Sequence, residues 1–411
     1  MRNKEVKMGV QFSMVGMYGD WIKETIESYP KEFSFLNYRW RNLSEWKREA
    51  RKKFFEYVVS PLTKAITTVN VKRRYNFDGL SIEELEWQLS FGPPTEAVFI
   101  KPDGEKGMLP GVLALHDHGG NKYFGKSKII SISNQQHPFL SEYQKVYYGG
   151  RSWACQLARR GYGVLVHDIF PFESRKIIAS ELPGFVVKRM MSHPEEIEEV
   201  RPEDIKGIET VTDYDVISES TGKIKKYNAF AGQHETLIAK SLVSAGLVWP
   251  GVYLLEDRAA LDYLCSREDI DSSRIGCGGL SGGGMRTNCL AAVDDRIKCS
   301  VTAGFMTTWQ DFALHTCYTH TWMIYIPILP RFMDYPDILS MRAPLPTMVL
   351  STLDDPLFTL VEVKKAETLI KGVFDKAGAG ENFVMNYYEG AHKFDIPMQE
   401  DAFSWFDRFL R

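Results

Sequence analysis

The sequence lacks the features that mark membrane proteins and nucleic-acid-binding proteins. No apolar stretch in its 411 residues approaches the roughly 20 residues that cross a bilayer, so we expect no membrane partner. The formal net charge is only −3, from 50 basic and 53 acidic residues. Such a balance gives no general attraction to polyanions, and we expect no nucleic-acid partner.

Marks of secretion and of disulfide or zinc chemistry are also lacking. The six cysteines show no CxxC spacing and lie mostly in apolar runs, as reduced core cysteines do. Polar residues interrupt the apolar segment at 8–17, and no A-x-A cleavage site follows it. A secretory signal is therefore not expected, and the sequence predicts a cytoplasmic protein.

One short glycine-rich stretch carries the strongest chemical signal. Residues 279–283 read Gly-Leu-Ser-Gly-Gly, a G-x-S-x-G pattern between an apolar run and a helix-compatible run at 285–292. A strand, a tight turn with a central serine and a helix form a nucleophile elbow, which holds the hydroxyl above the end of a sheet. The stretch lacks the Gly-Lys-Ser/Thr ending of a phosphate-binding loop. Ser281 is therefore the candidate nucleophile.

A serine nucleophile needs a histidine base, and the candidate is His392. It follows a strand-like run at 382–388 and precedes an amphipathic helix at 397–410. A histidine in such a loop can turn its imidazole into a site, whereas one on an apolar helix face is usually part of the core. The position after the last expected strand selects His392 among the nine histidines.

The acid that orients the base should follow an earlier strand. Asp355 comes after the apolar run at 346–351 and is preferred, with Asp354 as the fallback. Asp311, which follows the expected strand at 297–303, is a weaker candidate. Ser, then Asp, then His along the chain is the order that this class of fold uses.

An oxyanion hole needs backbone amides aimed at developing negative charge. The Gly282 amide directly follows the nucleophile, and the glycine-containing loop after the expected strand at 110–115 offers the amide of His118. His116, Asp117 and His118 also contain metal-ligating atoms. The further Asp-His pair of metallo-hydrolase patterns is missing, so we expect no metal here.

On these motifs the chain resembles the serine α/β-hydrolases, and in particular their dienelactone-hydrolase-like and acetyl-xylan-esterase-like branch. The resemblance covers about residues 95–411, through segments 115–120, 279–283, 355–358 and 390–394. It implies an α/β fold with an eight-stranded, mostly parallel sheet, helices on both faces, and no cofactor. Carried over, Ser281, His392 and Asp355 would form the triad, and the Gly282 and His118 amides the oxyanion hole.

The domain organisation follows from the same patterns. Residues 1–90 are expected to form a helical extension, because segment 44–59 has apolar residues at helical spacing. Residues 91–411 would form the catalytic domain, with alternating strands and helices that favour a parallel sheet. An expected hairpin joins strands at 86–91 and 95–101. The insertion at 172–240 is expected to act as a cap or rim.

The function that these residues favour is hydrolysis of small-molecule or oligosaccharide esters with short acyl groups. A peptidase or amidase, or a hydrolase of carbon–carbon bonds, could use the same triad. An inactive ligand-binding relative is the non-enzymatic alternative. A homo-oligomer is compatible with the sequence, which does not fix the number of copies or the natural substrate.

Overall fold

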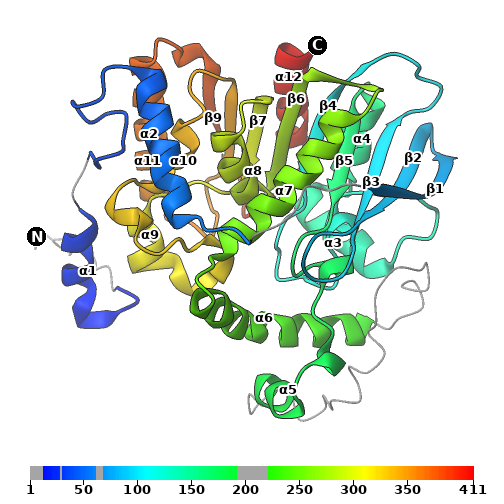
Figure 1. The fold of residues 1–411 in the computed structure, drawn as a ribbon, viewed down its shortest axis with the longest axis horizontal. Coiled ribbons are helices and arrows are strands. Elements are labelled where there is room, and N and C mark those ends of the chain that lie inside the picture. The colour runs from blue at the N-terminus through cyan, green and yellow to red at the C-terminus, as the bar shows by residue number, and fades with distance from the viewer. Residues whose placement is uncertain (1–12, 28–29, 62–67, 192–220) are drawn as a thin grey trace, which may run out of the picture.

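A computed structural model describes residues 13–27, 30–61, 68–191 and 221–411 (Figure 1). The described residues form one nine-stranded sheet in the order β1-β2-β3-β5-β4-β6-β7-β8-β9. The strands are β1 (Val69–Phe77), β2 (Leu80–Trp87), β3 (Thr95–Pro102), β4 (Leu109–Leu115), β5 (Gly163–His167), β6 (Ile270–Leu280), β7 (Ile297–Ala303), β8 (Thr347–Thr352) and β9 (Phe383–Tyr388). All neighbours from β5 to β9 pair in parallel, and β1, β2 and β3 are antiparallel to their neighbours.

The mostly parallel α/β architecture is confirmed, but the expected eight strands and the extent of the helical extension need correction. Residues 69–87 form β1 and β2 and belong to the sheet, so the prediction of a helical extension over 1–90 is wrong for them. The exposed strand β1 reads Val-Asn-Val-Lys-Arg-Arg-Tyr-Asn-Phe. Its apolar residues alternate at the two ends, as Val69 with Val71 and Tyr75 with Phe77, but the basic run at 72–74 interrupts the alternation, which is why the sequence pattern did not reveal the strand.

Helices cover both faces of the sheet (Figure 1). They are α1 (Gly19–Ile26), α2 (Leu43–Tyr57), α3 (Pro138–Tyr148), α4 (Trp153–Arg159), α5 (Gly184–Met191), α6 (Thr221–Ser244), α7 (Trp249–Ser266), α8 (Gly282–Val293), α9 (Trp309–Asp311), α10 (Tyr335–Ser340), α11 (Leu360–Lys376) and α12 (Ile396–Leu410). Within the described residues no single helix is long and apolar enough to span a membrane. Helices α6 and α7, bent by 89° at the break between them, reach that length and apolar character when they are taken together.

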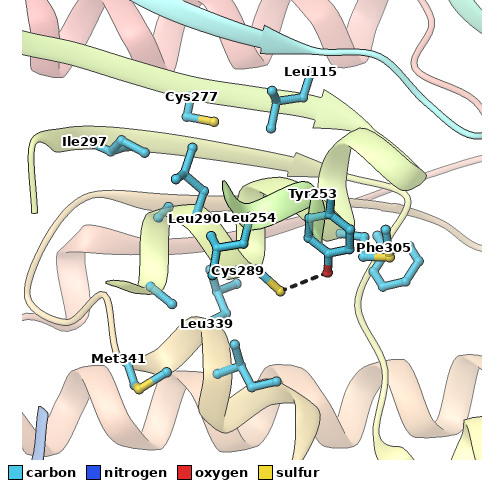
Figure 2. Close-up of a cluster of buried hydrophobic side chains, with 14 of the residues drawn as sticks. Leu115, Tyr253, Leu254, Cys277, Cys289, Leu290, Ile297, Phe305, Leu339 and Met341 are labelled. Carbon is cyan, nitrogen blue, oxygen red and sulfur yellow. Dashed lines mark hydrogen bonds between the residues drawn. The ribbon is translucent and has the colours of Figure 1, made fainter. Parts of the chain in front are cut away.

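Each face of the sheet has its own apolar core, because successive side chains of a strand point to opposite faces. On β4, Leu113 and Leu115 join one core with residues of α2, α7, α8, α10 and α11. Val112 and Ala114 join the other core with residues of α3, α4 and α12. Figure 2 shows part of the first core, where the Tyr253 hydroxyl on α7 lies 3.3 Å from Cys289 Sγ on α8.

The helical part of the N-terminal segment packs on the first core. The Asn42 side chain caps α2 by accepting a hydrogen bond from the Glu45 amide. Trp46, Ala50 and Phe54 lie on one face of α2 and are fully buried, as their spacing predicted. Burying a large apolar side chain stabilises a fold by about 1.5–3 kcal/mol, so α2 is firmly held against the core.

The described parts of the insertion at 172–240 include α5 and α6, and residues 192–220 lie outside the described residues. In Figure 1 α6 crosses beneath the main body, away from α2 and α12. Its Glu235 side chain lies 2.6 Å from His118, which follows the carboxyl end of β4. Helix α6 therefore lies over the edge of the sheet at which parallel α/β folds bind their ligands.

Candidate active site

Ser281 stands in a strained turn between β6 and α8. Its φ is 55° and its ψ is −117°, a backbone conformation that residues with a side chain rarely adopt. The Ser281 amide donates to the Ala303 carbonyl at 2.8 Å, and the Ser281 carbonyl accepts from the Met285 amide at 2.8 Å. A Cβ atom on Gly279 or on Gly283 would lie 2.3 Å or 2.1 Å from the Leu115 carbonyl oxygen. The predicted elbow geometry is present, and its glycines are required by this close approach of β4.

Asp355 and His392 meet beside this turn. His392 Nδ1 lies 2.7 Å from Asp355 Oδ2, and the two side chains are only 11% and 6% exposed. The second Asp355 oxygen accepts a hydrogen bond from the Leu357 amide at 2.9 Å. With Nδ1–H donating to the carboxylate, the lone pair of the imidazole is on Nε2. That nitrogen is buried and has no hydrogen-bond partner in the described part of the chain, so it makes no hydrogen bond to Ser281 in this structure.

Gly304 determines how closely the imidazole approaches the elbow. It follows β7, whose Ala303 pairs with Leu280 at the end of β6. A Cβ atom on Gly304 would lie 2.9 Å from His392 Cε1 and 3.1 Å from Leu280 Cδ1. The ring therefore lies against the backbone next to Ser281, and a residue larger than glycine at position 304 would occupy part of its space.

The two other candidate acids have different surroundings. Asp354 is exposed, and its amide donates to the Gly390 carbonyl at 3.2 Å. Asp311 is fully buried and accepts from the Thr307 hydroxyl at 2.7 Å and the Thr359 amide at 3.0 Å. Of the three, Asp355 is the one hydrogen-bonded to His392.

The two predicted oxyanion amides belong to segments in close contact. A Cβ atom on Gly282 would lie 2.7 Å from the His118 amide nitrogen, so only a glycine lets the loop after β4 approach this closely. The Lys128 ammonium, buried inside the loop, donates to the carbonyl oxygens of Asp117, His118 and Asn121. Burial lowers the pKa of Lys128 to about 8. The loop is thus shaped by a cation that satisfies its inward-facing carbonyls.

His116 and Asp117 make their hydrogen bonds in the interior of the protein. The Asp117 carboxylate accepts from the hydroxyl groups of Tyr143 and Tyr148. His116 Nδ1 lies 3.0 Å from the Asp117 carbonyl oxygen, and burial lowers the pKa of His116 well below its usual range. Among the described residues, no group of three or more His, Cys, Asp or Glu side chains is arranged to hold a metal ion.

Sequence reasoning missed a buried ion pair that supports the elbow helix. Arg286 on α8 donates to Asp257 on α7, with Nη2 2.5 Å from Oδ1, and its Nη1 lies 3.3 Å from the His116 carbonyl oxygen. His167 Nε2, at the end of β5, lies 3.0 Å from the same Asp257 oxygen. This network ties the helix after Ser281 to the loop that carries His118. No local motif announces it, since its members come from distant parts of the chain.

The sequence of this chain is similar to those of known proteins. The model of the prolyl oligopeptidase family matches residues 250–395, which include Ser281, Asp355 and His392. A Bacillus subtilis (strain 168) protein provisionally named hydrolase YtaP is 24% identical over 368 residues, which are 88% of this chain and 99% of that protein.

Solved structures that resemble this one include two esterases by name. A Bacteroides fragilis NCTC 9343 protein provisionally named an acetyl xylan esterase has a TM-score of 0.62 and 15% identity, and the match covers 94% of this chain and 85% of that one. A glucuronoyl esterase from Solibacter usitatus has a TM-score of 0.56 and 12% identity, with coverages of 92% and 97%. The sheet, the serine elbow and these matches show that the chain has the fold of the serine α/β-hydrolases, the superfamily that its sequence resembles.

Proposed function

We propose that this chain is a serine hydrolase that cleaves carboxylic esters of short acyl groups, acetylated carbohydrates among them. One observation carries the proposal: a buried Asp355–His392 pair lies beside a strained turn that presents Ser281. The names of the B. fragilis and S. usitatus proteins, both esterases, support the choice of an ester substrate. The cytoplasmic location and the homo-oligomeric state stay predictions.

In the proposed mechanism His392 Nε2 accepts the proton of the Ser281 hydroxyl as the oxygen attacks the ester carbonyl. Asp355 holds the ring with Nδ1–H toward the carboxylate and stabilises the imidazolium that forms. The amides of Gly282 and His118 donate to the oxyanion of the tetrahedral intermediate. The imidazolium then protonates the leaving alcohol. Water, deprotonated by the same nitrogen, releases the acyl group from Ser281.

A peptidase or amidase is the second candidate, because the matching family model is that of the prolyl oligopeptidases. That match spans residues 250–395, a part of the chain that carries the proposed triad. The triad chemistry is the same for both substrate classes, so the substrate and not the site distinguishes them. Turnover of dipeptide amides without turnover of esters would favour this candidate.

The proposal is tested by hydrolysis of p-nitrophenyl esters from acetate to octanoate, with wild type and Ser281→Ala compared. We expect the wild type to be most active on acetate, and the variant to lose on the order of 10⁴–10⁶ in kcat. Wild-type activity that survives in Ser281→Ala would contradict the assigned nucleophile. A wild type that hydrolyses no ester would contradict the ester assignment and shift the search to amides and carbon–carbon bonds.

A further inference from the structure

Glu235 is a buried carboxylate of the insertion that has no part in the triad. It lies on α6, is 6% exposed, and contacts two segments that are far apart in the sequence. Its Oε1 atom lies 2.6 Å from His118 Nε2 and 2.6 Å from Lys122 Nζ, in the loop after β4. Its Oε2 atom accepts from the Thr321 hydroxyl at 2.9 Å and the Trp322 amide at 3.2 Å. One side chain therefore joins the loop to the chain between β7 and β8.

The contact with His118 fixes both nitrogens of that ring. The Gly120 amide donates to His118 Nδ1 at 3.1 Å, so the ring proton is on Nε2 and is donated to Glu235. Burial, together with the Lys122 ammonium, lowers the pKa of His118, which keeps the ring neutral. The ring cannot rotate without breaking one of these two bonds. Because the His118 backbone lies against Gly282, a fixed ring also fixes the proposed oxyanion amide.

A second residue of α6 holds the same loop. The Asn228 side-chain oxygen accepts from the amides of Lys122 and Tyr123, both at 2.9 Å, and its nitrogen donates to the Asn121 side chain at 3.0 Å. Asn228 and Glu235 are seven residues apart, about two helical turns, and so lie on the same face of α6. The helix thus presents one face with two separate attachments to the loop that carries His118.

The Glu235 side chain stays charged in its contact with His118 and Lys122. Burial alone would raise the pKa of Glu235, but its contacts with the His118 ring and the Lys122 ammonium lower it well below its usual range. The carboxylate stays ionised, and Lys122, whose side chain is only 2% exposed, is its buried counter-ion. Removing the side chain would leave the buried Lys122 ammonium and the His118 Nε2–H without this acceptor, so the loop would lose one of its two attachments to α6.

We propose that Glu235 is a positioning residue of the oxyanion hole: helix α6 of the insertion, through Glu235 and His118, holds the loop after β4 at the distance from Gly282 that the transition state requires. This inference rests on the proposed ester hydrolysis. By this inference the insertion affects the rate of the chemical step, whereas a cap that only surrounded the substrate would affect substrate binding.

The test compares Glu235→Ala and Glu235→Gln with the same changes at Glu256. Glu256 is also a buried carboxylate, paired with Arg175 at 2.8 Å, and makes no hydrogen bond to the loop. The readouts are kcat and KM for p-nitrophenyl acetate, the thermal midpoint, and the hydrogen-exchange rate of the backbone amides at 116–122. All are measured on the full chain, well below the unfolding temperature of each variant.

We expect Glu235→Ala to lower kcat by about 10- to 100-fold, less than the loss of a whole oxyanion donor, with KM changed by less than about threefold. Amide exchange at 116–122 should accelerate. Glu235→Gln keeps an acceptor for His118 Nε2–H and should recover most of kcat. The Glu256 variants should lower the thermal midpoint and leave kcat and the exchange of the loop unchanged.

The inference would be overturned if folded Glu235→Ala kept the kcat of wild type, or if its loss of activity appeared in KM or matched that of the Glu256 variants. A wild type that hydrolyses no ester would contradict the proposed function, and the exchange data would then decide alone. Unchanged exchange at 116–122 in Glu235→Ala would overturn the positioning role, whereas accelerated exchange would support it.

Discussion

Replacing Gly304 by alanine tests the placement of His392 without changing any proposed catalytic group. The new methyl carbon would lie 2.9 Å from His392 Cε1 and 3.1 Å from Leu280 Cδ1. Carbon atoms in contact prefer about 3.5–4.0 Å, so the imidazole must move by roughly 0.6–1 Å. That movement would stretch or break its 2.7 Å hydrogen bond to Asp355 and change the direction of Nε2 toward Ser281.

The size of the effect follows from this displacement. A misplacement of about 1 Å costs up to about 100-fold in rate, so we expect Gly304→Ala to lower kcat/KM by about 10- to 100-fold. This corresponds to about 1.4–2.8 kcal/mol of transition-state stabilisation. Gly304 has a φ of 58°, so alanine there also costs about 1–2 kcal/mol of folding stability.

Gly378→Ala separates these two effects. Gly378 has a φ of 70°, and a Cβ atom there would meet no heavy atom within 4 Å. Both variants should lower the free energy of unfolding, measured in urea, and Gly304→Ala should lower it more, because its methyl group also crowds His392 and Leu280. Only Gly304→Ala should lower kcat/KM for p-nitrophenyl acetate. A folded Gly304→Ala protein with wild-type kcat/KM would refute the inferred placement of the imidazole.

Two further predictions concern carboxylates. Asp355→Asn should lower kcat by about 10³–10⁴, because the amide no longer favours the required tautomer of His392. Asp354 is exposed, and Asp354→Asn should keep kcat within about twofold of wild type. Equal losses in the two variants would refute the choice of Asp355 as the acid. Burial raises the pKa of Asp337 from 3.8 to about 7. Between these two pH values the folded chain therefore binds more protons than the unfolded chain. The stability that this group contributes is complete below pH 3.8 and is lost as the pH rises through 7. Asp337→Asn, which does not ionise, should therefore gain stability relative to wild type by about 1–3 kcal/mol between pH 4 and pH 8 in urea unfolding, and a difference independent of pH would contradict this assignment.

The elbow and the Asp355–His392 contact could be predicted because their signals are local or ordered along the chain. The glycines around Ser281 are required by the approach of β4, and that requirement is visible in five consecutive residues. The acid and the base each follow a strand, and the carboxyl ends of parallel strands meet at one edge of the sheet. Chain order alone leaves both Asp311 and Asp355 between Ser281 and His392, and the structure shows that Asp355 is the one hydrogen-bonded to His392.

The supports of the site could not be predicted in this way. Glu235 is one of several acidic residues in and near an insertion, and only the packing of α6 brings it to His118. Lys128 carries no sequence mark of burial, since lysines are almost always exposed. The ion pair between Arg286 and Asp257 could not be predicted either. A buried ion pair between two helices depends on tertiary distances, which the spacing of residues along one segment does not encode.

The exposed strand β1 has a consequence for the behaviour of the protein in concentrated solution. It forms one edge of the sheet and pairs with β2 alone among the described strands. A sheet edge can recruit a strand of another molecule and start aggregation. Here Lys72, Arg73 and Arg74 project from it, and a bulge interrupts its register between Val71 and Arg73. Charge and irregularity oppose such pairing, so the features that hid β1 from hydrophobic patterning also keep separate molecules from joining edge to edge.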